Sequence, residues 1–457
     1  MKSDITIIGG GASGLMAAYQ AARSATEAGR DIQVTVLEKM PRPGRKIMIT
    51  GKGRCNFTNV KEWNEFSAHI RSKANFIKSA FHTLPPSGLV GFFESFGVHT
   101  TVERGDRAFP ASYHASDIID ALVNACNSVG VKIVTESEVT GVSVPTGNNP
   151  SFVISLADGT QHIARKLIVA TGGLSYPGTG STGDGYEWAR AAGHRIEPTF
   201  PSLTALVPKG YKDAGKPLKG HIDRSTPLSA LGESLCGISL KNINATLLIE
   251  GNETDTEFGD IDFTDGGIEG PIGFQLSRKA VKAMVNGSKV SLQLDLKPGV
   301  DLTELTVRIK ELWSEIDRDP RSRNVREKER CRILLGKLMP WDLIPAFTSM
   351  HPEIITLERR GRTETKVWIN LVSIAKALKN WSFEIAGHVG YERAVVTAGG
   401  VSTDEIIPKT MESRLCPGLY FCGEVTDTDC DTGGYNLQAA FCTGALAGIS
   451  AAKSLQV

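Results

Sequence analysis

Three spaced glycines near the N-terminus have the pattern of a backbone cradle for an anion. Gly9, Gly11 and Gly14 lie between a short β-branched run, residues 4–8, and a stretch rich in Ala and Leu, residues 13–28. The first glycine permits a tight turn, the second lets backbone approach a pyrophosphate, and the third allows close helix packing. The N-terminus of the following helix would present free N–H groups to the same anion. The motif therefore predicts a dinucleotide site.

An acidic residue completes this pattern. Glu38 ends the second expected strand, residues 32–37, and stands 24 positions after Gly14. This spacing is near the offset of about 20 residues at which an acid hydrogen-bonds the adenosine ribose, and it disfavours a 2′-phosphate there. A second G-x-G-x-x-G match, residues 178–183, has no strand directly before it, and we interpret it as an unrelated loop. One dinucleotide site is expected, for NAD or FAD.

The elements that must position these residues belong to an α/β fold. Residues 4–37 read as a βαβ unit, whereas the middle of the chain alternates β-branched runs with turns and a few helical stretches. We therefore expect a Rossmann-type FAD-binding domain with an inserted, largely β lobe that carries some helices. The expected domains are residues 1–200 and 391–457 for the first, and residues 201–390 for an inserted substrate or cap lobe.

Composition excludes several classes of function. The formal net charge is +1, so no global field attracts nucleic acid or anionic lipid. Eight Cys without a C-x-x-C pair indicate reduced thiols and a cytoplasmic protein. We expect no secretory signal and no membrane span, because no run of about 18 apolar residues occurs. No spacing typical of a metal site or of a serine nucleophile elbow is present.

Four groups of motifs together resemble one known family. They are Gly9–Gly14 with Glu38, Gly44–Lys46 with Gly51–Asn59, Ala170–Gly173 with Thr182–Gly185, and Gly423–Glu424 with Gly433–Gln438. On these motifs the chain resembles the bacterial YhiN/BaiN-type flavoproteins, which are similar to the glutathione-reductase and fumarate-reductase superfamily. The resemblance covers nearly the entire length and implies FAD as the cofactor. Lys52 and Cys430 depart from it, since family members usually or often have Gly there.

The resemblance and the glycine motif together assign the expected cofactor contacts. These are Gly9, Gly11, Ala12, Ser13, Gly14, Glu38, Lys39, Arg45, Lys46, Gly53, Arg54, Cys55, Asn56, Val139, Thr171, Gly172, Gly173, Asp184, Gly423, Glu424, Gly434, Tyr435 and Asn436. Gly433 and Gly434 open the last expected helix, residues 436–452. The positive end of that helix would stabilise negative charge on the flavin pyrimidine ring.

Flavin carries the hydride chemistry itself, so the protein needs few catalytic side chains beyond a proton donor. The candidates are Cys55, in the loop that the resemblance places beside the flavin, Tyr435 at the head of the last expected helix, and His114. Arg54 and Lys52 would lower the pKa of the Cys55 thiol if they point toward it. The alternatives are a structural cysteine and a tyrosine that packs or hydrogen-bonds.

The resemblance implies an FAD-dependent oxidoreductase that reduces a conjugated C=C. The substrate would be a small-molecule, steroid-like enone, or a uracil of ribosomal RNA reduced to dihydrouridine. NADH or NADPH would donate electrons transiently, or a separate reductase would supply them. The alternative is a flavin-binding electron relay or assembly factor without turnover of its own.

An RNA substrate would give a use to a basic run in the middle of the chain. This run extends over residues 318–332, and its acids indicate an ion-paired, solvated face. If it binds RNA, neutralising Arg321, Arg323 and Arg326 should weaken salt-sensitive binding.

Overall fold

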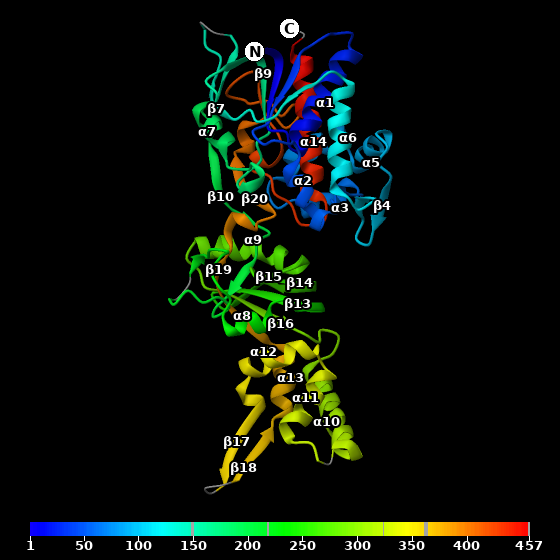
Figure 1. Cartoon of the computed structure of the whole chain (residues 1–457), viewed down its shortest axis with the longest axis vertical. Coiled ribbons are helices and arrows are strands. Elements are labelled where there is room, and N and C mark those ends of the chain that lie inside the picture. The colour runs from blue at the N-terminus through cyan, green and yellow to red at the C-terminus, as the bar shows by residue number, and fades with distance from the viewer. Residues whose placement is uncertain (148–149, 217–218, 323, 361–363, 456–457) are drawn as a thin grey trace. The chain divides into compact units, whose positions relative to one another are not determined.

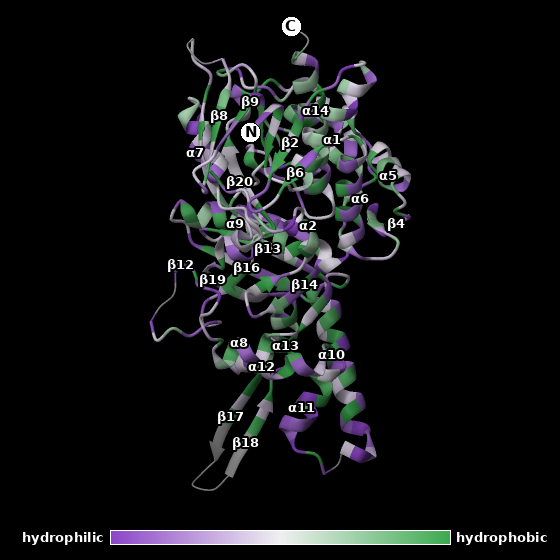
Figure 2. Cartoon of the chain, turned by 45° about the horizontal axis from the view of Figure 1, so that its top comes forward, coloured by the Kyte–Doolittle hydropathy of each residue, from purple (hydrophilic) through white to green (hydrophobic). Residues whose placement is uncertain are grey.

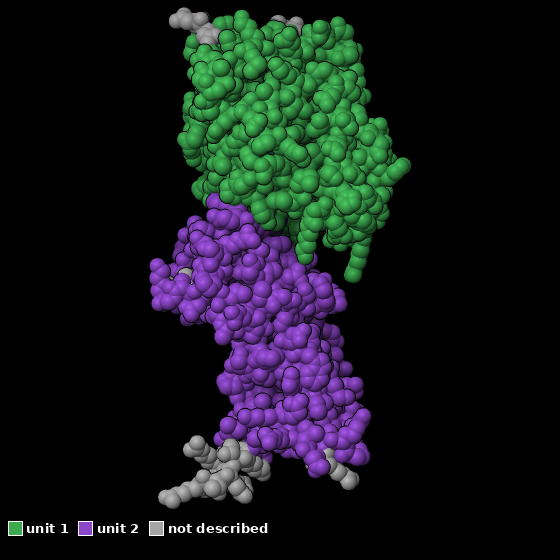
Figure 3. Space-filling view, in the orientation of Figure 1, with its two compact units in different colours: residues 1–202, 394–457 green, residues 203–393 purple. Residues whose placement is uncertain are grey.

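The computed structural model describes residues 1–147, 150–216, 219–322, 324–360 and 364–455. The chain divides into two compact units (Figure 3). Unit 1 consists of residues 1–202 and 394–457, and unit 2 consists of residues 203–393. Arg323, part of the basic run, lies outside the described residues.

Unit 1 is built on a sheet that joins both ends of the chain (Figure 1). Its order is β6-β2-β1-β9-β8-β7, and β21 also pairs with β9. The strands are β1 Lys2–Ile8, β2 Val34–Leu37, β6 Lys132–Val134, β7 Val139–Ser143, β8 Phe152–Leu156, β9 Gln161–Val169 and β21 Leu419–Phe421. Strands β6, β2, β1, β9 and β21 are parallel, whereas β8 and β7 are antiparallel additions. This is the expected Rossmann-type sheet.

Helices and small sheets surround this sheet. The helices of unit 1 are α1 Ala12–Glu27, α2 Arg45–Ile49, α3 Trp63–Phe66, α4 Ala74–Thr83, α5 Pro86–Ser95, α6 Ala115–Ser128, α7 Asp184–Ala191 and α14 Tyr435–Ser454. The small sheets pair β10 Ile196–Ser202 with β20 Val396–Val401, and β3 Thr58–Asn59 and β4 Thr100–Glu103 with β5 Arg107–Pro110.

The packing of α14 on α1 joins the C-terminal segment to the N-terminal turn. Figure 1 shows the two helices side by side, the first blue and the second red. Gly444 and Gly448 of α14 face the backbone of α1, where a Cβ would collide with the carbonyl oxygens of Ser13 and Ala17. The two helix backbones therefore approach as closely as only glycine permits.

Unit 2 is a second sheet with helices and a hairpin. The sheet order is β11-β15-β14-β13-β16-β19-β12, and its pairings are antiparallel except that of β12 with β19. The strands are β11 Leu206–Pro208, β12 Gly220–His221, β13 Ser239–Ile249, β14 Asn252–Thr264, β15 Gly267–Glu269, β16 Val290–Asp295 and β19 Trp381–His388, and the hairpin is β17 Ile355–Arg360 with β18 Glu364–Ile369. The helices are α8 Ala230–Leu235, α9 Pro271–Val285, α10 Leu302–Arg318, α11 Glu327–Gly336, α12 Ile344–Met350 and α13 Leu371–Lys379. The expected fold class, an α/β domain with an inserted β lobe carrying helices, is confirmed.

Hydropathy follows this architecture (Figure 2). The central strands of unit 1 are apolar and buried, as are the inward residues of α14, whereas α11 of unit 2 is largely hydrophilic. Among the described residues, no helix combines the length and apolar character that crossing a bilayer requires.

Two glycine substitutions test the contact between α1 and α14. Gly448→Ala should lower the free energy of unfolding by about 1–3 kcal/mol, because the methyl group meets the Ala17 carbonyl in a close-packed contact. Gly91→Ala in α5 is the matched control: its Cβ would meet no atom within 4 Å, so we expect a gain of about 0.5–1 kcal/mol. Urea unfolding monitored by circular dichroism measures both. Equal stability of Gly448→Ala and the wild type would contradict the packing described.

Candidate functional site

The glycine turn between β1 and α1 forms one wall of a cavity in unit 1. Gly9 has φ of 104°, and a Cβ there would lie 2.5 Å from the Ala170 carbonyl oxygen. At Gly14 a Cβ would collide with the carbonyl oxygen of Gly9. Gly11 lines the cavity and has no atom within 4 Å of its missing Cβ. Two glycines thus close the turn, and the third leaves space for a ligand.

Glu38 is fixed at the end of β2 by backbone donors. Its Oε2 accepts a hydrogen bond from the Gly10 N–H at 2.7 Å, and its Oε1 accepts one from the Met40 N–H at 2.8 Å. Burial raises the pKa of this carboxyl group, and these two backbone hydrogen bonds oppose the shift. Each carboxylate oxygen retains acceptor capacity, so Glu38 can still accept a hydrogen bond from a ribose hydroxyl in the cavity.

A lysine–aspartate pair lies near the same end of the cavity. Lys39 Nζ is 2.6 Å from Asp184 Oδ2, and it also donates to the hydroxyl of Thr182. Asp184 is the first residue of α7, where the positive end of the helix dipole favours an anion. The pair connects the β2 end of the sheet to α7.

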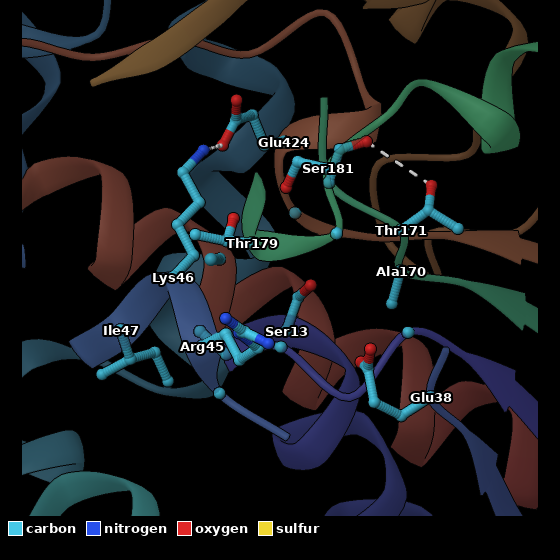
Figure 4. A pocket seen from close by; sticks show the side chains of 18 of the residues that line it. Ser13, Glu38, Arg45, Lys46, Ile47, Ala170, Thr171, Thr179, Ser181 and Glu424 are labelled. Atoms are coloured by element: carbon cyan, nitrogen blue, oxygen red, sulfur yellow. Dashed lines mark hydrogen bonds and ion pairs between the residues drawn. The ribbon is translucent and has the colours of Figure 1, made fainter. Parts of the chain in front are cut away.

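A second ion pair, between Lys46 and Glu424 (Figure 4), belongs to a larger hydrogen-bond network. Lys46 Nζ lies 2.6 Å from Glu424 Oε2, and Ser175 Oγ hydrogen-bonds both side chains at 2.5 Å. The Thr397 N–H donates to Glu424 Oε1 at 2.9 Å, and Thr397 Oγ1 accepts from the Leu174 and Ser175 N–H groups. Four chain segments therefore meet at one carboxylate.

Gly173 explains why this network fits. A Cβ at this position would lie 2.5 Å from Thr397 Oγ1 and 2.9 Å from Glu424 Oε1. A side chain at position 173 would displace Thr397 or Glu424, so the network requires glycine there.

The N-terminus of α14 closes another side of the cavity. Gly433 and Gly434 have φ of 119° and 98°, and a Cβ on Gly434 would collide with the backbone of Thr58. The Asn436 side chain accepts from the Cys430 N–H and donates to the Cys430 and Asp431 carbonyls, which holds the preceding loop. No acidic residue occupies the first turn of α14, so its positive end is available to a negatively charged group.

The structure brings most of the expected contacts together. Those that line the cavity are Gly9, Gly11, Ala12, Ser13, Glu38, Lys39, Arg45, Lys46, Val139, Thr171, Gly172, Asp184, Gly423, Glu424 and Asn436. Those that do not line it are Gly14, Gly53, Arg54, Cys55, Asn56, Gly173, Gly434 and Tyr435.

Cys55 is enclosed by protein. Its side chain is fully buried, and burial raises the pKa of the thiol to about 12. Arg54 and Lys52 do not lower this pKa, since burial dominates it. The Arg54 guanidinium instead lies 4.8 Å from the Phe109 ring centroid, and it pairs with Glu103 at 3.4 Å.

Tyr435 packs against an aromatic cluster. Its ring stacks on His69 with centroids 4.2 Å apart, and it meets Phe66 edge-on at 5.0 Å. Burial raises the pKa of its hydroxyl to about 12. Asp431 holds the stacked imidazole through His69 Nδ1 at 2.9 Å.

Sequence reasoning missed part of the wall. The interpretation of residues 178–183 as an unrelated loop is wrong, since Thr179, Gly180 and Ser181 line the cavity. Gly180 has φ of 105°, and a Cβ there would lie 3.0 Å from Met40 Cγ. The other lining residues that were not expected include Arg42, Ser137, Trp188, Val395, Val396 and Thr428. Leu437 also lines the cavity and belongs to the motif at residues 433–438, and the glycine pattern at residues 178–183 was the local signal for its own segment.

The cavity fits the FAD expected from sequence. Gly11 lines it and leaves open the path that a pyrophosphate needs. Arg42 and Arg45 line it without an ion pair to any carboxylate in the described part of the chain. These guanidinium groups can therefore neutralise a diphosphate.

Gly11→Val should abolish FAD binding without unfolding the protein. The residue has extended backbone, with φ of −84°, and open space around its missing Cβ, so the apoprotein tolerates a side chain that blocks the pyrophosphate. The absorption spectrum of the purified variant gives the FAD content, and thermal unfolding of both apoproteins gives stability. Full FAD occupancy in this variant would refute the placement of the site.

Cys55 should resist alkylation in the native state. At pH 7 a thiol with a pKa of about 12 is protonated, and no surface of it is exposed to reagent. Iodoacetamide treatment followed by peptide mass spectrometry should label Cys55 only after unfolding, whereas the half-exposed Cys236 reacts first. Rapid native labelling of Cys55 would contradict its burial.

Comparisons with known proteins agree with this description. Residues 3–450 match the family described as the HI0933-like protein Rossmann domain. The chain is similar to a 3-dehydro-bile acid delta(4,6)-reductase of Clostridium scindens, with 32% identity over 98% of this chain and 99% of the relative. It is similar at 32% identity to a ribosomal RNA dihydrouridine synthase of Haemophilus influenzae, over 96% of each chain.

A solved structure shares the fold. A 3-ketosteroid delta1-dehydrogenase of Sterolibacterium denitrificans superposes with a TM-score of 0.50 at 14% identity, over 99% of this chain and 100% of that one. The family match and the two sequence relatives confirm the resemblance inferred from the motifs. The chain belongs to the HI0933-like Rossmann family, and it is an FAD-dependent oxidoreductase.

Proposed function

We propose that the protein is a reductase that adds hydride from bound, reduced FAD to a conjugated C=C of its substrate. The observation that carries this proposal is one continuous cavity in unit 1. It extends from Glu38 and Gly11, which suit the ribose and pyrophosphate, to Lys46, Glu424 and the N-terminus of α14. That second end has the positive helix terminus that favours an anionic reduced flavin.

The names of the two relatives support the same chemistry. One relative is a bile-acid delta(4,6)-reductase and the other forms dihydrouridine in ribosomal RNA. A steroid enone and a uracil ring both contain a C=C conjugated to a carbonyl group. Hydride adds to the carbon distant from that carbonyl, and a proton must reach the neighbouring carbon, so the C=C becomes a single bond.

When bound, FAD supplies the hydride chemistry, and this chain must hold the substrate and deliver the proton. Cys55 and Tyr435 remain proposed donors, and both groups are protonated at neutral pH because burial raises each pKa to about 12. Their position outside the cavity lining means that donation would require a relay or a shift of the wall. Lys46 has an ammonium group in the lining itself.

The electron source belongs to the proposal as well. NADH or NADPH would meet the flavin transiently, or a separate reductase would supply electrons. All eight cysteines are free, which is typical of the reducing cytoplasm where we place the reaction. The competing interpretation is an electron relay or assembly factor, which would bind FAD but turn over no substrate of its own.

Anaerobic stopped-flow mixing separates these interpretations. NADH or NADPH should bleach the flavin absorbance of the FAD-loaded protein. Subsequent addition of a steroid enone or a uracil-containing RNA should restore the spectrum of oxidised flavin. Mass spectrometry of the product should show a gain of two hydrogens. Flavin that is bleached but not reoxidised by either substrate class would favour the relay, and no bleaching by either nucleotide would point to a separate reductase.

A further inference from the structure

The indole ring of Trp341 in unit 2 is partly exposed and packs against its neighbours, and we call it the platform. Trp341 follows α11 and retains 48% of its surface exposed. A Cβ on Gly336, the last residue of α11, would lie 2.5 Å from the indole atoms Cε2 and Cζ2. The Arg332 guanidinium lies 5.7 Å from the Trp341 ring centroid. One part of the indole therefore rests on helix backbone and a cation, and the remainder is exposed to solvent.

A groove adjoins this platform between α11, α12 and the start of β17. Lys328 and Arg332 line it with exposed cationic side chains, beside Leu335, Pro345 and Ile355. Glu329 also lines the groove, at 4.0 Å from Arg332, the outer limit of an ion pair. Such an exposed pair is weak, so the Arg332 guanidinium remains available to a stronger anion.

We propose that this platform and groove form a docking surface for single-stranded RNA. A base would stack on the exposed Trp341 indole, and the adjacent phosphates would contact Arg332 and Lys328. Base stacking on aromatic side chains combined with basic groups along the backbone is the usual way in which proteins bind single strands. The inference rests on the proposed function, because it selects the uracil-containing substrate over the small enone.

The location of the cofactor cavity in the chain supports this assignment. Every residue that lines the cofactor cavity belongs to unit 1. The exposed indole and cations of unit 2 belong to a separate surface that suits another ligand. A polyanion with exposed bases matches both its charge and its aromatic group, whereas a small steroid would use neither the two cations nor a solvent-exposed indole.

The structure changes which residues of the basic run would contact RNA. Arg321 is engaged by Asp319 at 2.9 Å, and Arg330 by Asp317 and Glu327 at 2.5 Å. Arg330 also lies 5.8 Å from the Trp313 ring centroid and is only 19% exposed. The surface therefore uses Lys328 and Arg332, which line the groove.

Fluorescence anisotropy with a fluorescein-labelled, U-rich 12-nucleotide RNA tests the surface on the full, FAD-loaded chain. Trp341→Ala should weaken binding about tenfold through loss of stacking, and Trp341→Phe should retain most of the affinity. Gly336→Ala should also weaken binding, since the methyl group displaces the indole from its support. The double variant Lys328→Gln with Arg332→Gln should reduce the slope of log K against log salt by about 1.4.

Arg308→Gln on α10 is the control for loss of an exposed positive charge elsewhere, because Arg308 is 63% exposed and distant in sequence from the groove. It should change neither the affinity nor the salt slope. Binding within twofold of the wild type in both Trp341→Ala and Gly336→Ala would overturn the proposal, as would an equal loss in Arg308→Gln. FAD content and thermal unfolding of each variant exclude misfolding.

Enone reduction by the same variants separates this inference from the proposed function. If the wild type reduces a steroid enone, Trp341→Ala should do so at the same rate, since Trp341 lies outside the cofactor cavity. If the wild-type protein reduces an enone but binds no RNA, the docking surface is contradicted and the proposed reductase function is supported. If RNA binding depends on Trp341 but no C=C is reduced, the docking surface is supported and the proposed reductase function is contradicted.

Discussion

The cofactor cavity depends on one close contact between the two ends of the chain. Helix α14 reaches the backbone of α1 because Gly444 and Gly448 have no side chains, and Gly423 leaves space for Ser13. Through this contact, β21 and α14 become part of the sheet and helix layer that begin with residue 2. Without it, the glycine turn would be an open surface loop rather than the wall of an enclosed site.

Charge in the cavity is divided between paired and unpaired groups. Lys39 with Asp184 and Lys46 with Glu424 are short, partly buried pairs, and each connects distant chain segments. Such pairs fix geometry more than they add stability, because desolvation offsets their attraction. Arg42 and Arg45 have no such pair among the described residues and provide the positive charge that a diphosphate requires.

The two units have different chemistry. Unit 1 encloses its cations and helix termini around a cavity. Unit 2 has its most distinctive feature, the indole of Trp341 resting on Gly336 beside Arg332, at the surface. An enclosed site suits a cofactor that remains bound. An exposed aromatic and basic surface suits a large substrate that must bind and dissociate in each catalytic cycle.

The sequence by itself determined the turn and its ligand class. Gly9, Gly11 and Gly14 shape one turn and Glu38 accepts a hydrogen bond from it, and their spacing along the chain is sufficient to predict this arrangement. Strand and helix patterns, together with the motif resemblance, likewise predicted the Rossmann-type sheet and the inserted lobe.

Only the tertiary structure decided which way the loop side chains point. Cys55 and Tyr435 lie close to motif glycines in sequence, yet one is enclosed and the other stacks on His69. Gly180 appeared unrelated to the site, yet its loop lines the cavity. The physical reason is that a loop's local pattern fixes its backbone turns, whereas the direction and partners of its side chains depend on long-range packing, which spacing along the chain does not encode.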